Sequence, residues 1–304
     1  MRSSVLVALG AATLATAGCQ FYSYVSSAGD LGIDCFKDTE IKAALPSTEA
    51  SKSAPVAVLV HGYTATTYET NYAAEFLKKR GYIVSQVMMG AHGTNLVDFS
   101  KSTWRIWAEP VATEYNRLTA AGYQNVSLLT VSTGGPVAME LYAEGKFNPP
   151  PKRISMVAPI LDFADKLSGA AGLLKALGAV NSPSKNSGSS KCHWYSDRPI
   201  DAVLQLVDLT EVMKGRLRGT INLPPDLKIQ IFQSLRDKTV DPLSAQIWAN
   251  GLKGGMVSVT MVDSDFHVPI GPEFIDDSGK NTWTDADRAT RDRILEQVAA
   301  GNRP

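Results

Sequence analysis

The chain has 304 residues, of which 44% are hydrophobic and 20% are charged. This length and composition suffice for a large hydrophobic core in one α/β domain. Thirty basic and thirty acidic residues cancel, and no basic stripe with interleaved aromatic residues occurs. The composition therefore argues against a nucleic-acid partner.

The first segment, residues 1–18, has the pattern of an export signal. Arg2 gives a basic start, and residues 5–17 are apolar or small, a run too short to span a membrane. The small residues directly before Cys19 resemble the bacterial lipobox, in which the cysteine receives lipid and becomes the mature N-terminus. The resemblance implies a lipid anchor in the bacterial cell envelope. It also implies the outer membrane in a Gram-negative cell, because Gln20 rather than Asp follows. Plain secretion or a periplasmic location is the alternative.

Residues 19–54 are polar and lack strong periodicity, so we expect a tether and an edge segment. Apart from Cys19, the chain contains two cysteines, Cys35 and Cys192. A single remaining pair in an exported chain commonly forms a disulfide, and we predict one between Cys35 and Cys192. Two unrelated thiols are the alternative, because the sequence does not give the distance between them.

Residues 55–160 alternate between apolar runs and amphipathic stretches, and we expect them to form the first part of the core. Strands are predicted at 54–60, 82–88, 126–131 and 154–160, and helices at 68–80, 104–121 and 133–144. Short glycine-rich connections join these elements. This alternation predicts a doubly wound, mostly parallel sheet.

Residues 161–225 interrupt the alternation with leucine-rich helical stretches around a Ser/Gly/Lys tract. Their apolar side chains cannot all pack against the sheet. We therefore expect a helical lid over the substrate pocket, the alternative being a lid that packs only on itself. Residues 226–304 complete the core, with strands predicted at 228–235 and 257–262 and helices at 242–252 and 284–299.

The apolar run at 126–131 stops on Ser132, and small residues follow it. The motif T-x-S-x-G at 130–134 differs by one residue from the G-x-S-x-G nucleophile elbow, a sharp strand-to-helix turn that exposes the serine Oγ. Gly134 meets the demand for a small residue there, and Thr130 meets it less well. An ordinary turn with a serine N-cap is the alternative.

A serine nucleophile needs a base, and the base needs a carboxylate that orients it. His267 follows the last predicted strand, where the carboxyl ends of parallel strands converge, and we predict that it is the base. Asp237 leaves the strand before it and is the predicted acid. Asp241, directly before Pro242, has the pattern of a helix N-cap.

The other histidines and the tryptophan pair have structural interpretations. His61 and His92 each precede a glycine at a strand end, and we expect His61 to hold its loop. His193 lies in the insertion. Trp104 and Trp107 have helical spacing and are predicted to pack in the core. No cluster of ligand residues occurs in the sequence, so we expect no metal and no organic cofactor.

The order Ser, Asp, His on strands that alternate with helices is the α/β-hydrolase arrangement. Residues 55–270 resemble the bacterial carboxylesterase and monoacylglycerol-lipase group of that superfamily. The motifs that carry the resemblance are H-G-Y-T at 61–64, G-A-H-G-T at 90–94, S-T-W-R-I-W at 102–107, T-x-S-x-G at 130–134, D-x-x-V-x-P at 237–242 and S-x-F-H-V at 264–268. The sequence departs from the family at Thr130, where glycine is usual, and at Ala91, since the family has P-G-H-G. The resemblance implies an oxyanion hole formed by the backbone N–H groups of Tyr63 and Thr133.

The resemblance implies a serine esterase that cleaves short- or medium-chain esters or monoacylglycerols through an acyl-enzyme. Ser132 would attack the ester, His267 would transfer the proton, and Asp237 would orient His267. A lysophospholipase or thioesterase with the same triad is one alternative. A catalytically inactive envelope-binding protein on a hydrolase scaffold is another.

Overall fold

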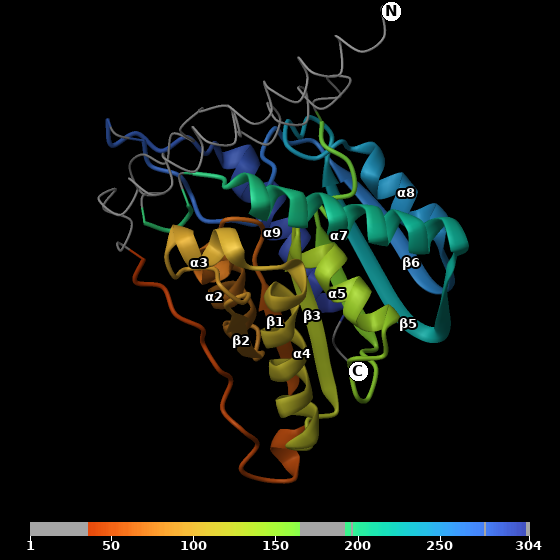
Figure 1. Cartoon of the computed structure of the whole chain (residues 1–304). Coiled ribbons are helices and arrows are strands. Elements are labelled where there is room, and N and C mark those ends of the chain that lie inside the picture. The colour runs from red at the N-terminus through yellow and green to blue at the C-terminus, as the bar shows by residue number, and fades with distance from the viewer. Residues whose placement is uncertain (1–35, 165–191, 196, 277, 302–304) are drawn as a thin grey trace, which may run out of the picture. The chain divides into compact units, whose positions relative to one another are not determined.

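The computed structural model describes residues 36–164, 192–195, 197–276 and 278–301 (Figure 1). The chain divides into two units, residues 1–36 and 37–304, and the fold below is that of the second. The predicted signal peptide, Cys19 and Cys35 lie outside the described residues, as does the stretch 165–191 of the expected lid. None of the described helices is long and apolar enough to cross a membrane.

Six parallel strands form one sheet in the order β2-β1-β3-β4-β5-β6. Their bounds are β1 Pro55–Val60, β2 Ile83–Val87, β3 Asn125–Val131, β4 Arg153–Val157, β5 Ile221–Ser234 and β6 Leu252–Val262. The central strands β1, β3 and β4 are buried beyond their first residue, which explains their continuous apolar sequences. The predicted doubly wound parallel sheet is confirmed.

Helices alternate with the strands close to the predicted ranges. Their bounds are η2 Ala50–Ser53, η3 Thr67–Thr70, α2 Asn71–Lys78, α3 Leu96–Lys101, α4 Trp104–Ala120, α5 Gly134–Ala143, α7 Ile200–Gly219, α8 Leu243–Gly251 and α9 Asp285–Ala300. The short helix α3 was not predicted from the sequence, since six residues are too few to show a helical period.

The helices cover both faces of the sheet. Figure 1 shows α4, α5 and α7 in front of the strands. On the opposite face, α2 and α9 share one buried apolar cluster with the strands, to which Leu77, Leu129 and Leu295 belong. This arrangement leaves the carboxyl ends of the strands to the loops that carry the predicted site residues.

Side-chain caps fix where several helices begin. The side chain of Asn95 accepts the N–H of Asp98 at the start of α3, and Thr103 accepts that of Ile106 at the start of α4. Thr284 opens α9 with a reciprocal capping box. These contacts satisfy backbone donors that a helix start otherwise leaves unpaired.

Strand β5 begins at Ile221, seven residues earlier than the predicted start at 228, and therefore inside the range 161–225 assigned to the lid. Pro224 and Pro225 lack an N–H group, and the register with β6 shifts between Leu223 and Lys228. Because prolines interrupt a strand pattern, the sequence suggests a strand only after them.

The described part of the expected lid is helix α7. Its buried side chains include Leu206, Leu209 and Met213, and the helix contacts α3, α4, α5 and α8. This half of the insertion thus packs on the core, while Leu206 also lines the pocket described below. That the insertion acts as a lid stays a prediction.

Glu273 ties the loop after β6 to α9. Its carboxylate lies 2.9 Å from Arg288 and 3.1 Å from Arg291. The hydrogen bond from Arg288, opposed by burial and helped by Asn281 and Arg291, lowers the pKa of Glu273 to about 2. Because His267 lies six residues before Glu273, these ion pairs support the loop that carries it.

We expect Glu273→Gln to lower the melting temperature at pH 7 by roughly 2–4 °C, because it removes about 1 kcal/mol of ion pairing. The folded-state pKa is depressed, so the stabilisation is present above the ordinary pKa near 4.5 and is lost as the pH falls toward 2. Thermal unfolding at pH 7 and pH 3 measures this, with the exposed Glu109→Gln as the control. An equal loss at both pH values would contradict the assignment.

Candidate active site

Ser132 stands at a sharp turn between β3 and α5. Its φ of 50° lies in the left-handed region, which is strained for a residue other than glycine and typical of a nucleophile elbow. At Gly134, an added Cβ would lie only 2.9 Å from the carbonyl oxygen of Val60, so strand and helix nearly touch. Thr130 is nevertheless accommodated, fully buried, with its hydroxyl 3.5 Å from the carbonyl oxygen of Ser155.

The structure brings Ser132, His267 and Asp237 together. His267 Nε2 lies 2.9 Å from Ser132 Oγ, and His267 Nδ1 lies 2.8 Å from Asp237 Oδ2. The Asp237 side chain is fully buried, while that of His267 is 20% exposed. Three residues predicted from separate strand ends thus form one continuous chain of hydrogen bonds.

Asp237 is held as an ionised hydrogen-bond acceptor. Its Oδ1 accepts the N–H groups of Thr239 and Val240 at 2.8 and 3.0 Å, and its Oδ2 also accepts Gln233 Nε2 at 3.0 Å. Burial acts to raise the pKa of Asp237. The hydrogen bond and charge of His267, together with the two backbone donors, outweigh burial and hold that pKa below its usual value.

Asp241, the other carboxylate after β5, interacts with the start of α8. Its Oδ1 accepts the N–H of Leu243, the first residue of α8, at 2.9 Å. Asp241 therefore supports the start of that helix, although the cap position itself is Pro242, one residue later than predicted.

The two predicted oxyanion donors border Ser132. Thr133 is the N-cap residue of α5, and Tyr63 follows Gly62, where an added Cβ would lie 3.0 Å from the Cβ of Ser132. Within the described part of the chain, the backbone N–H groups of Tyr63 and Thr133 form no hydrogen bond. Two donors therefore remain available beside the serine, at a helix start that favours negative charge.

The known proteins similar to this chain include lipolytic enzymes. No protein-family model matches the chain. A thermostable monoacylglycerol lipase from Bacillus sp. (strain H-257) is 27% identical over 219 residues, which are 72% of this chain and 85% of that protein.

Solved structures of lipolytic enzymes have the same fold. A metagenome-derived lipolytic enzyme matches with a TM-score of 0.60 and 19% identity, over 86% of this chain and 96% of that one. A soluble variant of monoglyceride lipase from Saccharomyces cerevisiae matches with a TM-score of 0.61 and 11% identity, over 88% and 91%. The chain has the α/β-hydrolase fold.

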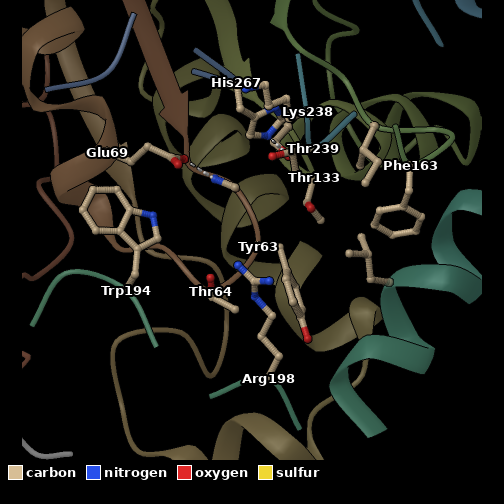
Figure 2. A pocket seen from close by; sticks show the side chains of 14 residues that line it. Tyr63, Thr64, Glu69, Thr133, Phe163, Trp194, Arg198, Lys238, Thr239 and His267 are labelled. Carbon is tan, nitrogen blue, oxygen red and sulfur yellow. Dashed lines mark hydrogen bonds between the residues drawn. The ribbon is translucent and has the colours of Figure 1, made fainter. Parts of the chain in front are cut away.

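A pocket opens over Ser132 and His267. It has a volume of about 460 Å³. Ile160, Phe163 and Leu206 give it an apolar wall. Figure 2 shows Phe163 on one side of the pocket and Glu69 and Trp194 on the other. The pocket thus offers one surface suited to a hydrocarbon chain and another that is polar.

Glu69 is a buried carboxylate that the sequence reasoning missed. Its Oε2 accepts the backbone N–H of Gly62 at 2.6 Å, so it fixes the loop that carries Tyr63. Burial raises the pKa of Glu69, while Gly62, His267 and Trp194 act to lower it. In the sequence, Glu69 is recognisable only as an acidic residue seven positions after Gly62. No spacing rule connects these two positions, so the sequence does not predict their hydrogen bond.

His61 and His92 are buried structural residues whose rings lie edge to face, with centroids 5.1 Å apart. Nδ1–H of His61 donates to the carbonyl oxygen of Gly62 at 2.9 Å, and its Nε2 accepts the N–H of Met89 at 3.0 Å. Burial lowers the pKa of His61 to about 4 and that of His92 well below its usual value. Both rings are therefore neutral at physiological pH.

His193 and the tryptophan pair are not part of the hydrogen-bonded series of Ser132, His267 and Asp237. His193 Nδ1 pairs with Asp38 at 2.6 Å. Trp107 is fully buried and Trp104 nearly so, as predicted for core packing. The part of the chain that the structure describes contains no group of three or more His, Cys, Asp or Glu placed to hold a metal.

Proposed function

We propose that the chain is a serine hydrolase of carboxylic esters that works through an acyl-enzyme. The observation that carries this proposal is the hydrogen-bonded series Ser132, His267 and Asp237 beneath an open pocket. Ser132 Oγ attacks the ester carbonyl as His267 Nε2 takes its proton. The N–H groups of Tyr63 and Thr133 stabilise the oxyanion.

The second half of the reaction uses the same groups. His267 gives its proton to the leaving alcohol, which leaves the acyl group on Ser132. His267 then removes a proton from a water molecule that attacks this ester, and the carboxylic acid is released with the Ser132 hydroxyl restored. Asp237 stabilises the imidazolium formed in each half and fixes its tautomer.

The substrates that we propose are short- or medium-chain esters or monoacylglycerols. The apolar wall of Ile160, Phe163 and Leu206 is suited to an acyl chain, and the Bacillus relative is a monoacylglycerol lipase. The purified mature chain should hydrolyse p-nitrophenyl esters of graded chain length and react stoichiometrically with a fluorophosphonate probe. Activity only on lysophospholipids or thioesters would favour those alternatives, whereas neither hydrolysis nor labelling would favour an inactive binding protein.

We also propose that Cys19 carries the lipid anchor that holds the enzyme in the cell envelope. Each buried CH₂ contributes about 0.8 kcal/mol, so two or more acyl chains bind a bilayer stably. We expect wild type to incorporate labelled fatty acid and sediment with membranes, and Cys19→Ser to lose the label. Cys192→Ser, a matched cysteine substitution, should keep it. A soluble native protein whose N-terminus is not Cys19 would instead support plain secretion.

A disulfide between Cys35 and Cys192 is proposed for the exported enzyme. The proposal is supported by the composition: the chain has three cysteines, and Cys35 and Cys192 are the two that remain when Cys19 carries the lipid. Closing such a long loop should stabilise the fold by about 3–5 kcal/mol, reduced by any strain. Mass spectrometry of protein from the oxidising compartment, alkylated without reductant, should find neither cysteine modified. Two alkylated thiols would contradict the bond.

A further inference from the structure

One arginine in the pocket differs from most of the other described arginines. Seven of the ten other described arginines form an ion pair with a carboxylate of the described chain, namely Arg80, Arg105, Arg117, Arg216, Arg236, Arg288 and Arg291. Arg198 forms no ion pair or hydrogen bond with any residue that the structure describes. Since a guanidinium offers five donors, a half-buried one without an acceptor calls for an explanation.

Arg198 belongs to the same cavity as Ser132 and His267. Figure 2 shows its guanidinium beside Thr64 and the Tyr63 ring, directed toward the interior of the pocket. It lies two residues before α7, which packs on the core. The backbone position of Arg198 is therefore set by an ordered helix start.

The Tyr63 hydroxyl is a second polar group without a partner in this region. Its oxygen is buried and has no hydrogen-bond partner among the described residues. Burial raises the pKa of Tyr63, and the Arg198 guanidinium is near enough to oppose that rise. A donor hydroxyl and a cationic donor thus lie near each other without an acceptor.

The carboxylates of the site do not neutralise Arg198. Glu69 accepts the N–H of Gly62, and Asp237 is held by His267 and backbone donors. Lys238, exposed at the same pocket, also has no partner among the described residues and appears near His267 in Figure 2. The described pocket lining therefore carries two cationic side chains that have no carboxylate partner.

The positive charge of Arg198 determines which substrate groups can bind favourably beside it. A hydrocarbon chain against the guanidinium would take water from a cation and return no hydrogen bond, which is unfavourable. A carboxylate or phosphate oxygen would gain short, charge-assisted hydrogen bonds, and two oxygens can bind the guanidinium fork together. The lining is thus matched to an ester that also carries an anionic group.

We propose that Arg198 binds a carboxylate or phosphate group of the substrate, so that the enzyme prefers anionic esters to neutral ones of equal chain length. This inference rests on the proposed ester hydrolysis. The anion could belong to the acyl half, as in a dicarboxylic acid monoester, or to the alcohol half, as in an acylglycerol phosphate. Two matched substrate pairs distinguish these sources.

The first pair is p-nitrophenyl hexanoate and mono-p-nitrophenyl adipate, and the second is 1-decanoylglycerol and 1-decanoylglycerol 3-phosphate. We expect kcat/KM for the anionic member of one pair to exceed that of the neutral member by about ten-fold. Arg198→Gln should reduce that ratio roughly ten-fold, to near 1, the effect of losing hydrogen bonds to a charged group. Arg198→Lys should retain part of the preference.

Arg218→Gln is the matched control, because Arg218 is exposed at the far end of α7 and does not line this pocket. It should leave the ratio unchanged. Anionic substrates no better than neutral ones in both pairs, or a preference that survives in Arg198→Gln, would overturn the proposal while neutral ester hydrolysis still stands.

A binding measurement separates this inference from the proposed catalysis. Calorimetry on Ser132→Ala should show tighter binding of the anionic member of the responsive pair. The double variant Ser132→Ala/Arg198→Gln should lose that difference. Equal binding of anionic and neutral members to Ser132→Ala would overturn the anion site, whatever the catalytic activity of the wild type.

Discussion

Ser132→Ala is expected to abolish ester hydrolysis, with kcat falling by about 10⁶-fold, the loss typical when a triad nucleophile is removed. The reason is geometric: Ser132 Oγ is the atom within hydrogen-bond reach of His267 Nε2, at 2.9 Å. A small residual rate should persist, since the donors at Tyr63 and Thr133 stay in place. Release of p-nitrophenol and labelling by a fluorophosphonate probe measure the two effects.

The control for this variant is Ser127→Ala, a buried serine on the same strand. Its Oγ donates to the carbonyl oxygen of Val56 at 3.0 Å, far from the turn that carries Ser132. That change should affect stability and leave labelling intact. A Ser132→Ala variant that the probe labels as strongly as wild type would show that the nucleophile lies elsewhere.

The sequence predicted the central sheet well because each buried strand reads as a continuous apolar run. It also predicted the residues of the hydrogen-bonded series, since parallel strands bring their carboxyl ends to one edge. Ser132 follows β3 directly, Asp237 lies three residues after the end of β5, and His267 lies five residues after the end of β6. Position in the topology, rather than proximity in sequence, made these three residues predictable.

The first residues of β5 and of β6 were not predictable in the same way. Pro224 and Pro225 obscure the first half of β5. Gly254 and Gly255 have positive φ values of 75° and 58° on β6. At Gly254 an added Cβ would lie 2.4 Å from the carbonyl oxygen of Leu223, so this close approach requires glycine. These prolines and glycines interrupt the strand pattern in the sequence, and the pairing of β5 with β6 explains why they are there.

The residues on the polar side of the pocket could not be predicted from the sequence either. Glu69 acts on Gly62 through a turn, and Arg198 reaches the cavity from a segment just before α7. Neither residue belongs to a periodic pattern or a spaced motif. Glu69 is distinguished by its burial and its hydrogen bond to Gly62, and Arg198 by its lack of a hydrogen-bond or ion-pair partner among the described residues. Only the folded structure shows these properties.

Asp237→Asn should lower kcat about 10³- to 10⁴-fold while the fold is retained. An asparagine amide at this position can donate to His267 Nδ1. The imidazole would then carry its proton on Nε2, where it faces Ser132 Oγ and cannot accept the serine proton. The measurement is kcat on a soluble p-nitrophenyl ester, alongside circular dichroism to confirm folding.

Asp241→Asn is the matched comparison, because it makes the same chemical change four residues away. Its remaining carbonyl oxygen can still accept the N–H of Leu243, so kcat should stay within about two-fold of wild type and only a small change in stability is expected. The two variants together test which carboxylate orients His267. Full activity in Asp237→Asn with loss in Asp241→Asn would assign the acid to Asp241 and would require the loop after β5 to rearrange during catalysis.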